Sequence, residues 1–362
     1  MISNNSPELE RLFLDGSRRP APREFALMLS RRCNIACRHC GIESSPLVRD
    51  RMSLKDAKRF IVEAAALPEF RKVTFTGGEP TLVRRDLLAL LALCRELGLQ
   101  TRIVTNGWWA RNRSNGYRYL AALRDAGLTE LNFSADKFHL EFTDAATLRN
   151  ALQCARDLDF AQIVSFVCTG ETEPMLEFAQ LYEVDPHELL DLRDAFSANA
   201  KLVDLRRDRI HVYWGGLIGL GRAASYPAEL RYHPLDFFPV GNQCGEVVNK
   251  PVIYPDGTFQ ACCCAGGKVA AFTVGNAHDS GVAELFDLMK ARSHFRLINT
   301  HGPRQLYDIM RSALPSRSVR DDFTSICELC VEATRGVPTD VVDNAVDSWL
   351  LAETLKALTT QG

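Results

Sequence analysis

Three cysteines near the start of the chain have a spacing that suits metal–sulfur chemistry. Cys33, Cys37 and Cys40 lie in the segment CNIACRHC, where three and then two residues separate them. Three thiolates can bind three irons of a [4Fe-4S] cluster and leave the fourth iron open to an exogenous ligand. A structural zinc ion is the alternative, but zinc needs a fourth ligand, and His39 beside Cys40 is poorly placed to reach the same metal. The spacing by itself therefore indicates a three-thiolate loop, which suits an open iron–sulfur cluster better than a structural zinc site.

A second group of cysteines lies in the last third of the chain. Twelve residues, Gly257 and four residues separate Cys244 from Cys262, and two residues separate Cys327 from Cys330. The PDG turn between IY and TFQA predicts a β-hairpin that brings the first pair together, and CELC predicts a second pair at a helix start. Four thiolates in this order suit either a complete iron–sulfur cluster or a four-cysteine zinc site.

The elements that must position these residues alternate between strand and helix patterns up to about residue 221. The helical pattern SLKDAKRFIVEAAAL begins after Ser53, a plausible N-cap, and RRDLLALLALCRELG ends at Gly98. This alternation predicts a parallel sheet with crossover helices. The predicted strands are 25–30, 72–76, 101–105, 130–135, 162–167 and 209–214.

Polar motifs come directly after several of these strands. They are GGE after the second strand, TNG after the third and SADKFH after the fourth, and they supply Gly77, Gly78, Glu79, Asn106, Ser134, Asp136 and His139. Barrel enzymes assemble their active sites at the C-terminal ends of strands. This regularity favours an α/β fold with a partial (β/α)6 TIM-like barrel over a doubly wound sheet.

Together the CNIACRHC and GGE motifs resemble the radical S-adenosylmethionine (SAM) superfamily over roughly residues 25–225. The resemblance implies that the open iron of the Cys33, Cys37 and Cys40 cluster binds the amino and carboxylate groups of SAM. One electron then cleaves the sulfonium, and the 5'-deoxyadenosyl radical abstracts hydrogen from a substrate.

The resemblance also implies which residues contact SAM. Gly77, Gly78 and Glu79 would receive the amino group, and Arg222 in GLGRA would pair with the carboxylate. Asn106 is a further candidate for SAM binding. The alternating side chains of Ser134 and Asp136 are candidates for hydrogen bonds to the ribose, although Asp136 is equally placed to cap a helix.

The second cysteine group resembles the shorter auxiliary-cluster extension of radical SAM enzymes, called a twitch domain. The larger SPASM extension has further cysteines that this chain lacks. The resemblance implies one auxiliary [4Fe-4S] cluster, held by Cys244, Cys262, Cys327 and Cys330, that relays electrons or stabilises the fold. A zinc ribbon is the alternative.

Several other residues are candidates for catalysis. Cys263, Cys264 and Cys168 could each donate a hydrogen atom to a substrate radical, although small buried thiols also pack well in a core. His139 is a candidate proton acceptor near the barrel mouth.

Composition limits the classes of protein to which the chain can belong. Its 362 residues include 43 basic and 45 acidic ones, so a dominant nucleic-acid surface is not expected. With no secretion signal and no long apolar stretch, we expect a cytoplasmic protein that does not bind membranes. We expect an N-terminal extension at 1–24, a core barrel at 25–225, a twitch-like domain with a β-hairpin plus helices at 226–340, and a C-terminal helix at 341–362.

The resemblance implies an oxygen-sensitive enzyme. Enzymes with such extensions often act on peptides in ribosomal natural-product maturation, and this is the substrate class we expect. The alternative is a small-molecule dehydrogenase or epimerase acting on a sugar, cyclitol or antibiotic precursor. About 24 residues before the first strand are too few for a fused peptide-recognition domain, which weakens the peptide interpretation, although a separate protein can supply recognition. An electron donor such as flavodoxin or ferredoxin would be a further partner. The non-enzyme alternative is a zinc-stabilised binding scaffold.

Overall fold

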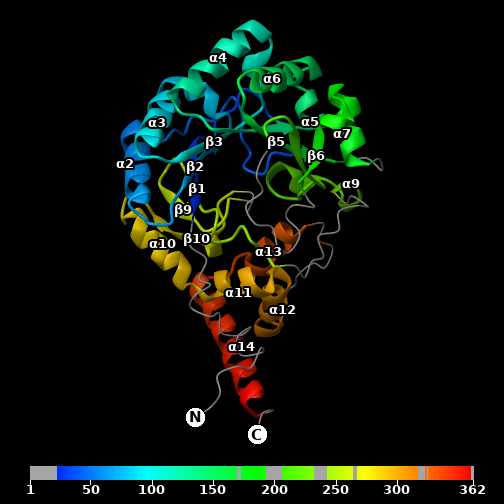
Figure 1. The fold of residues 1–362 in the computed structure, drawn as a ribbon. Coiled ribbons are helices and arrows are strands. Elements are labelled where there is room, and N and C mark those ends of the chain that lie inside the picture. The colour runs from blue at the N-terminus through cyan, green and yellow to red at the C-terminus, as the bar shows by residue number, and fades with distance from the viewer. Residues whose placement is uncertain are drawn as a thin grey trace.

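The fold is organised around one sheet of ten strands. The computed structural model describes residues 23–168, 173–192, 206–231, 243–263, 267–316, 323 and 325–359. In the described residues the strand order is β10-β9-β8-β1-β2-β3-β4-β5-β7-β6. Figure 1 shows this sheet between a layer of helices and the C-terminal part of the chain.

The six predicted strands form the parallel middle of the sheet in chain order. A doubly wound sheet would reverse its strand order at a switch point, so this order is that of a barrel sector. The terminal strands β10 and β6 lie at opposite ends of the sheet, so the described strands form an open, partial barrel. The strands are β1 (Glu24–Ser30), β2 (Lys72–Gly77), β3 (Gln100–Thr105), β4 (Glu130–Ala135), β5 (Ala161–Val167), β7 (Ile210–Gly215) and the short edge strand β6 (Leu189–Asp191).

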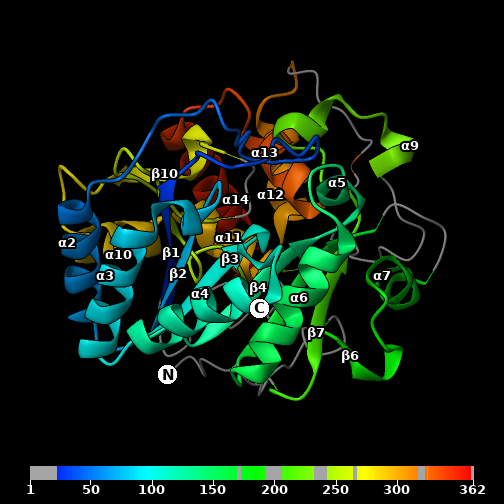
Figure 2. The ribbon, with the colours of Figure 1, turned by 90° about the horizontal axis from the view of Figure 1, so that it is seen from above.

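Crossover helices cover the outer face of these strands, as Figure 2 shows. Outward side chains such as Val73 and Phe75 are fully buried against them. Ser53 caps the first helix as predicted, since its Oγ accepts a hydrogen bond from the Asp56 amide at 3.0 Å. The helices are α2 (Leu54–Ala65), α3 (Arg84–Glu96), α4 (Arg113–Ala126), α6 (Ala145–Asp157) and α7 (Pro174–Tyr182).

The predicted hairpin after residue 225 is present, but it belongs to the same sheet. Strands β8 (Val252–Ile253) and β9 (Thr258–Gln260) are antiparallel, and Gly257 between them has a φ of +79°. Strand β8 pairs with β1 in parallel, and β10 (Thr273–Asn276) continues beyond β9. The hairpin covers the edge of β1, which an open barrel leaves unpaired. The strands before and after the predicted domain boundary near residue 225 therefore belong to one sheet.

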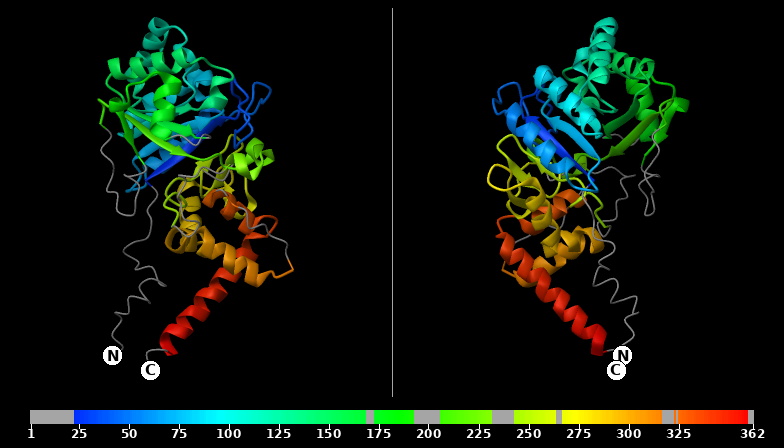
Figure 3. Two further views of the ribbon diagram at one scale, coloured as in Figure 1. Left: turned by 90° about the vertical axis from the view of Figure 1, so that its right-hand side faces the viewer. Right: turned by 60° about the vertical axis from the view of Figure 1, so that its left-hand side comes forward.

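The remaining helices follow the hairpin. The first of them packs beside α2, and the others pack against one another (Figure 3). In chain order these helices are α10 (Val282–Ala291), α11 (Ser293–His301), α12 (Pro303–Ala313), α13 (Ile326–Thr334) and α14 (Thr339–Thr359). The predicted last helix corresponds to α14, where Val342 and Val346 are fully buried and Leu351 is 62% exposed. None of the helices in the described ranges has both the length and the apolar composition that a bilayer crossing requires.

Candidate active site

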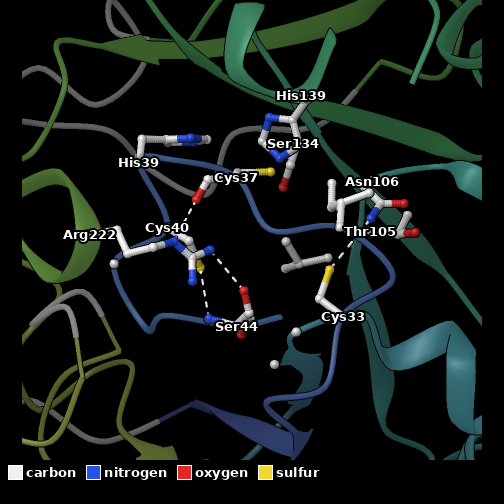
Figure 4. Close-up of a pocket in the computed structure, with 15 residues that line it drawn as sticks. Cys33, Cys37, His39, Cys40, Ser44, Thr105, Asn106, Ser134, His139 and Arg222 are labelled. Carbon is white, nitrogen blue, oxygen red and sulfur yellow. Dashed lines mark hydrogen bonds between the residues drawn. The ribbon is translucent and has the colours of Figure 1, made fainter. Parts of the chain in front are cut away.

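The three N-terminal cysteines border a cavity of about 220 Å³ at the C-terminal ends of β1–β4. They lie on the loop that follows β1, and Figure 4 shows them around one central space. Besides these cysteines, the lining includes six of the other residues predicted from the sequence: Gly77, Gly78, Asn106, Ser134, His139 and Arg222.

The cysteine thiols are largely withdrawn from solvent. Cys33 is 7% and Cys37 is 6% exposed, and burial raises the pKa of the Cys33 thiol to about 12. The Ser44 amide donates a hydrogen bond to the Cys40 sulfur at 3.4 Å. A buried thiol with a raised pKa loses its proton when a bound metal supplies positive charge. Three thiols around one cavity are a donor set that fits an iron–sulfur cluster.

Two glycines form the wall of the cavity where β2 ends. Gly77 has a φ of +136°, and a Cβ at this position would lie 2.1 Å from the Ser30 carbonyl oxygen. A Cβ on Gly78 would lie 2.1 Å from the Arg32 carbonyl oxygen. The Gly78 amide donates to the Ser30 oxygen at 2.8 Å, so β2 is held directly against the start of the cysteine loop. No side chain fits here, and the exposed backbone is suited to close approach by a ligand.

The side chain of Glu79 lies outside the cavity, so the predicted contact with the SAM amino group would fall to its backbone. It is 2% exposed and does not line the cavity. Its Oε1 accepts hydrogen bonds from the Thr81 hydroxyl at 2.6 Å and the Thr105 hydroxyl at 2.9 Å, and its Oε2 accepts from the Asn106 amide at 2.9 Å. Burial raises the pKa of this carboxyl, and these bonds oppose the rise. Instead of facing a SAM amino group, the side chain joins the end of β2 to the end of β3.

Asn106 lines the cavity and also supports the cysteine loop. Its Nδ2 donates to Asn34 Oδ1 at 3.0 Å and lies 3.8 Å from the Cys33 sulfur. Its Oδ1 accepts from the Trp108 amide at 3.1 Å. The amide group therefore fixes the position of the first cysteine relative to β3.

Asp136 is the helix cap rather than a free ribose ligand. It is 1% exposed, and its Oδ1 accepts from the amides of Phe138 at 2.9 Å and His139 at 3.0 Å, which begin α5 (Lys137–Leu140). Ser134, two residues earlier, lines the cavity. Of the two predicted ribose contacts, the structure therefore leaves Ser134.

Two histidines also meet at Asp136. His139 Nδ1 lies 2.8 Å from Asp136 Oδ1, and His39 Nε2 lies 3.2 Å from Oδ2. Burial opposes protonation of His139, but the Asp136 charge and hydrogen bonds to Asp136 and Cys37 raise the pKa of His139 to about 10. The raised pKa favours the protonated, hydrogen-bond-donating form of His139 at neutral pH, and its role as a proton acceptor stays a prediction.

Sequence reasoning missed this grouping because the histidines are separated by about a hundred residues. Ligand atoms of His39, Asp136 and His139 lie within 4.8 Å of one another, which a small cation site also requires. The hydrogen bonds already account for that proximity. The aspartate thus ties α5 to the cysteine loop.

Arg222 clamps the cysteine loop from the opposite side. Its Nε donates to the Cys37 carbonyl at 2.9 Å, its Nη2 donates to the Ser44 carbonyl at 2.8 Å, and its amide donates to the Cys40 carbonyl at 3.2 Å (Figure 4). A Cβ on Gly221 would lie 2.2 Å from the Gly41 oxygen, so the close contact needs glycine there. Two sides of the guanidinium are thus bonded to the loop, whereas a free pairing with the SAM carboxylate was expected.

Replacing Arg222 with methionine is expected to loosen the loop and to lower the iron bound by the reconstituted protein. The variant removes both guanidinium bonds and leaves two carbonyls without their donors. Iron content and cluster absorbance measure the effect. Arg38→Met is the matched control because Arg38 is on the same loop, is 64% exposed and pairs with Glu141. Equal iron in the two variants would contradict the clamp.

The second cysteine group surrounds α13, which begins after the Ser325 cap. Burial and the nearby Cys244 and Cys263 sulfurs raise the pKa of Cys327 to about 12. Burial and Cys244 likewise raise the pKa of Cys330. Cys244, from before the hairpin, therefore lies in electrostatic range of both α13 thiols.

The surplus thiols differ in what they contact. Cys263 packs against Ala26 and Met28, whose side chains point to the inner side of β1. Cys168 is 1% exposed and shares the outward, helix-packed face of β5 with Phe166, so it faces away from the cavity and does not suit a hydrogen donor. Cys264 lies outside the described residues.

Comparisons with known proteins agree with this geometry. Residues 27–183 match the Radical SAM superfamily. YydG of Bacillus subtilis, whose name assigns it to peptide biosynthesis, is 27% identical over 139 residues, 38% of this chain and 44% of YydG. The PqqA peptide cyclase of Methylobacterium nodulans is 30% identical over 215 residues, 58% of this chain and 52% of the cyclase. GTP 3',8-cyclase of Alkaliphilus metalliredigens is 25% identical over 298 residues, 74% of this chain and 90% of that enzyme.

The chain spans about half the length of the first two of these relatives. The matched segment begins within β1 and ends just after α7, so it includes the cysteine loop, the glycine wall and Asn106. Residues 27–183 of this chain therefore form a radical SAM domain.

Proposed function

We propose that the protein is a radical SAM enzyme. The observation that carries the proposal is the arrangement of Cys33, Cys37 and Cys40 around one cavity whose wall is the Gly77–Gly78 backbone. When bound, a [4Fe-4S] cluster with SAM supplies a 5'-deoxyadenosyl radical that abstracts hydrogen from a substrate.

The chain's own residues would keep this site in place and exclude water from it. Arg222 and Asn106 hold the cysteine loop from two sides. Glu79 holds the ends of β2 and β3 together from behind the cavity. Ser134, which lines the cavity, would contact the sugar of SAM.

We further propose that Cys244, Cys262, Cys327 and Cys330 hold one auxiliary iron–sulfur cluster. Support comes from the burial of Cys262 and Cys330, which are 7% and 8% exposed, and from the mutual charge repulsion of Cys244, Cys327 and Cys330. Buried thiols that repel one another when ionised are suited to a cation that neutralises them. The cluster would relay electrons or stabilise the fold.

A peptide is the substrate class we propose. Two of the relatives are named for peptide chemistry, although each match covers only part of the relative. A small molecule is the alternative, and the longer match to GTP 3',8-cyclase supports it. A one-electron donor such as flavodoxin or ferredoxin and a separate peptide-recognition protein are the expected partners.

The first experiment measures iron and zinc in protein purified and reconstituted without oxygen. We expect about eight irons per chain, from two four-iron clusters, an EPR signal that SAM perturbs, and 5'-deoxyadenosine after reduction. Zinc without iron would contradict the enzyme and support the scaffold.

Epimerisation is a specific form of this function in which Cys263 would be the hydrogen donor, although this thiol also lies in electrostatic range of Cys244 and Cys327. A thiol on the inner side of β1 would break its S–H bond and form a C–H bond on a substrate radical. The resulting thiyl radical would then take one electron from the external donor and one proton from water. Cys263→Ala is expected to leave 5'-deoxyadenosine formation intact and to stop incorporation of solvent deuterium into product.

The outward-facing Cys168→Ala serves as the control for this prediction, and Cys264→Ala tests the neighbouring thiol. Product from Cys263→Ala with normal deuterium content would contradict the assignment. The measurement is mass spectrometry of product formed in heavy water.

A further inference from the structure

A charged cluster lies below the cavity on the same face of the sheet. Side chains alternate along a strand, so Arg102 shares a face with Val104, and Glu130 shares one with Ser134. Val104 and Ser134 line the cavity. Lys72 pairs with the same carboxylate as Arg102, at the start of β2. These three side chains therefore belong to the inner face, near the strand ends opposite the cavity.

The cluster pairs two cations with one shared carboxylate. Glu130 Oε1 lies 2.6 Å from the Lys72 ammonium, and Oε2 lies 2.6 Å from Arg102 Nη2 and 2.9 Å from its Nε. Each cation is 17% exposed and Glu130 is 13% exposed. Glu24 on β1 is the register neighbour of Lys72 and is 14% exposed, so its carboxylate, 3.8 Å from Lys250, adds a further negative charge on this face. An anion would therefore be held here by hydrogen-bond donors rather than by an excess of positive charge.

Several hydrogen-bond donors of the cluster are not used by the pairing with Glu130. Among the described residues, Lys72 donates to Glu130 alone, and Arg102 bonds Glu130 through Nε and Nη2, which leaves Nη1. Thr74 pairs with Arg102 in the β2–β3 register, and its buried hydroxyl has no hydrogen-bond partner in the described part of the chain. An ammonium carries three donors and a guanidinium carries five, so the pairing with Glu130 uses few of them.

The surrounding inner face is polar as well. In a closed barrel the interior is packed with branched apolar side chains. Here the corresponding positions between the cluster and the cavity carry Thr74, Asn132 and Ser165, and Ser165 donates to Asn132 Oδ1 at 3.0 Å. Tyr213, on the same face of β7, is 41% exposed. The inner side of this open sheet is therefore suited to a polar molecule rather than to a sealed core.

The separation between the cluster and the cavity can be counted along the strands. Ser134 is four residues beyond Glu130 on β4, and Gly77 is five residues beyond Lys72 on β2. At roughly 3.3 Å per residue, Glu130 and Lys72 lie about 13–16 Å along their strands from these two residues, and Arg102 lies about 7 Å from Val104. An extended peptide of four or five residues covers the same length.

We propose that Lys72 and Arg102 form a subsite that binds a carboxylate of the substrate, about four residues from the residue that reacts. This inference rests on the proposed function, because it assumes a substrate that reaches from the cavity along the inner face. The carboxylate belongs either to an acidic side chain or to the C-terminus of the substrate. Glu130 lies between the two cations and offsets part of their positive charge.

The test is calorimetric titration of the reconstituted full chain with N-acetylated octapeptides of alanine and serine. One set carries a single glutamate at each position in turn with an amidated C-terminus, a second carries glutamine instead, and a third carries glutamine with a free C-terminal carboxylate. We expect an acidic peptide to bind at least tenfold more tightly than its neutral counterpart. The second and third sets distinguish a side-chain carboxylate from a terminal one.

Substitutions in the cluster test the assignment directly. Lys72→Gln and Arg102→Gln are expected to abolish the preference for the acidic peptide, and Glu130→Gln is expected to increase it. A gain of affinity in Glu130→Gln cannot result from misfolding. Arg124→Gln, on the outer helix α4, is the matched control because Arg124 pairs with Asp125 at the surface.

Equal binding of acidic and neutral peptides, including no measurable binding of either, would overturn the subsite. A preference that survives in both Lys72→Gln and Arg102→Gln would overturn it too. Formation of 5'-deoxyadenosine in the same preparations is scored separately. Turnover of SAM without carboxylate preference would leave the proposed function intact and remove the subsite alone.

Discussion

Replacing Cys33, Cys37 and Cys40 together with alanine is expected to remove about half of the iron, from about eight to about four atoms per chain. The variant lacks every thiol that borders the cavity. SAM should then no longer perturb the EPR signal, and formation of 5'-deoxyadenosine should fall to background. Iron analysis and EPR spectroscopy of wild type and variant, prepared side by side, measure both effects.

The matched control is Cys94→Ala, because Cys94 is fully buried within α3 and belongs to the core. It should retain the wild-type iron content. If the triple variant kept all of its iron, the cluster would have to lie elsewhere, most directly at the second cysteine group. If the variant instead lost zinc, the protein would be a metal-stabilised scaffold.

Replacing Glu79 with alanine is expected to lower the free energy of unfolding by roughly 3 kcal/mol or more. The substitution leaves three buried donors without their acceptor, namely the amides of Thr81 and Asn106 and the hydroxyl of Thr105. Each buried donor without a partner costs about 1–3 kcal/mol. Urea denaturation of the cluster-free protein without oxygen measures the loss.

Glu79→Gln provides a graded comparison for this prediction. The glutamine oxygen can still accept from Thr81 and Thr105, whereas its amide nitrogen cannot accept from Asn106. An intermediate loss of stability is therefore expected. Wild-type stability in Glu79→Ala would contradict the view that this carboxylate joins β2 to β3, and would reopen a direct contact with SAM.

The order of the parallel strands was accessible from the sequence because it follows local patterns. Each strand is a short apolar run bounded by helical segments, and all six predicted strands agree with the structure to within a residue or two. The motif positions then favoured a barrel, since Cys33, Gly77 and Asn106 each follow a strand. The ends of parallel strands meet at one edge, so chain order alone brought these residues together.

Other assignments failed because they depend on contacts between residues far apart in the chain. Glu79 and Arg222 are charged residues at motif positions, which suggests ligands, yet their side chains bind the protein's own carbonyls, amides and hydroxyls. Cys168 follows a strand in the same way as Asn106, but the pleat directs it to the outer face. The sequence shows that successive side chains of a strand point to opposite faces, but it does not show which of them point to the inner face.

The sequence by itself determined that this chain has an α/β fold and a three-cysteine loop at the C-terminal edge of a parallel sheet. Residue type and spacing are enough for this, since thiol chemistry and strand periodicity are local properties. The tertiary structure decided that the hairpin joins the barrel sheet, that His39 and His139 meet at Asp136, and that Lys72 and Arg102 share Glu130. Each of these contacts joins residues that are far apart in the chain. Folding brings them together and removes them from water, so local sequence patterns do not reveal them.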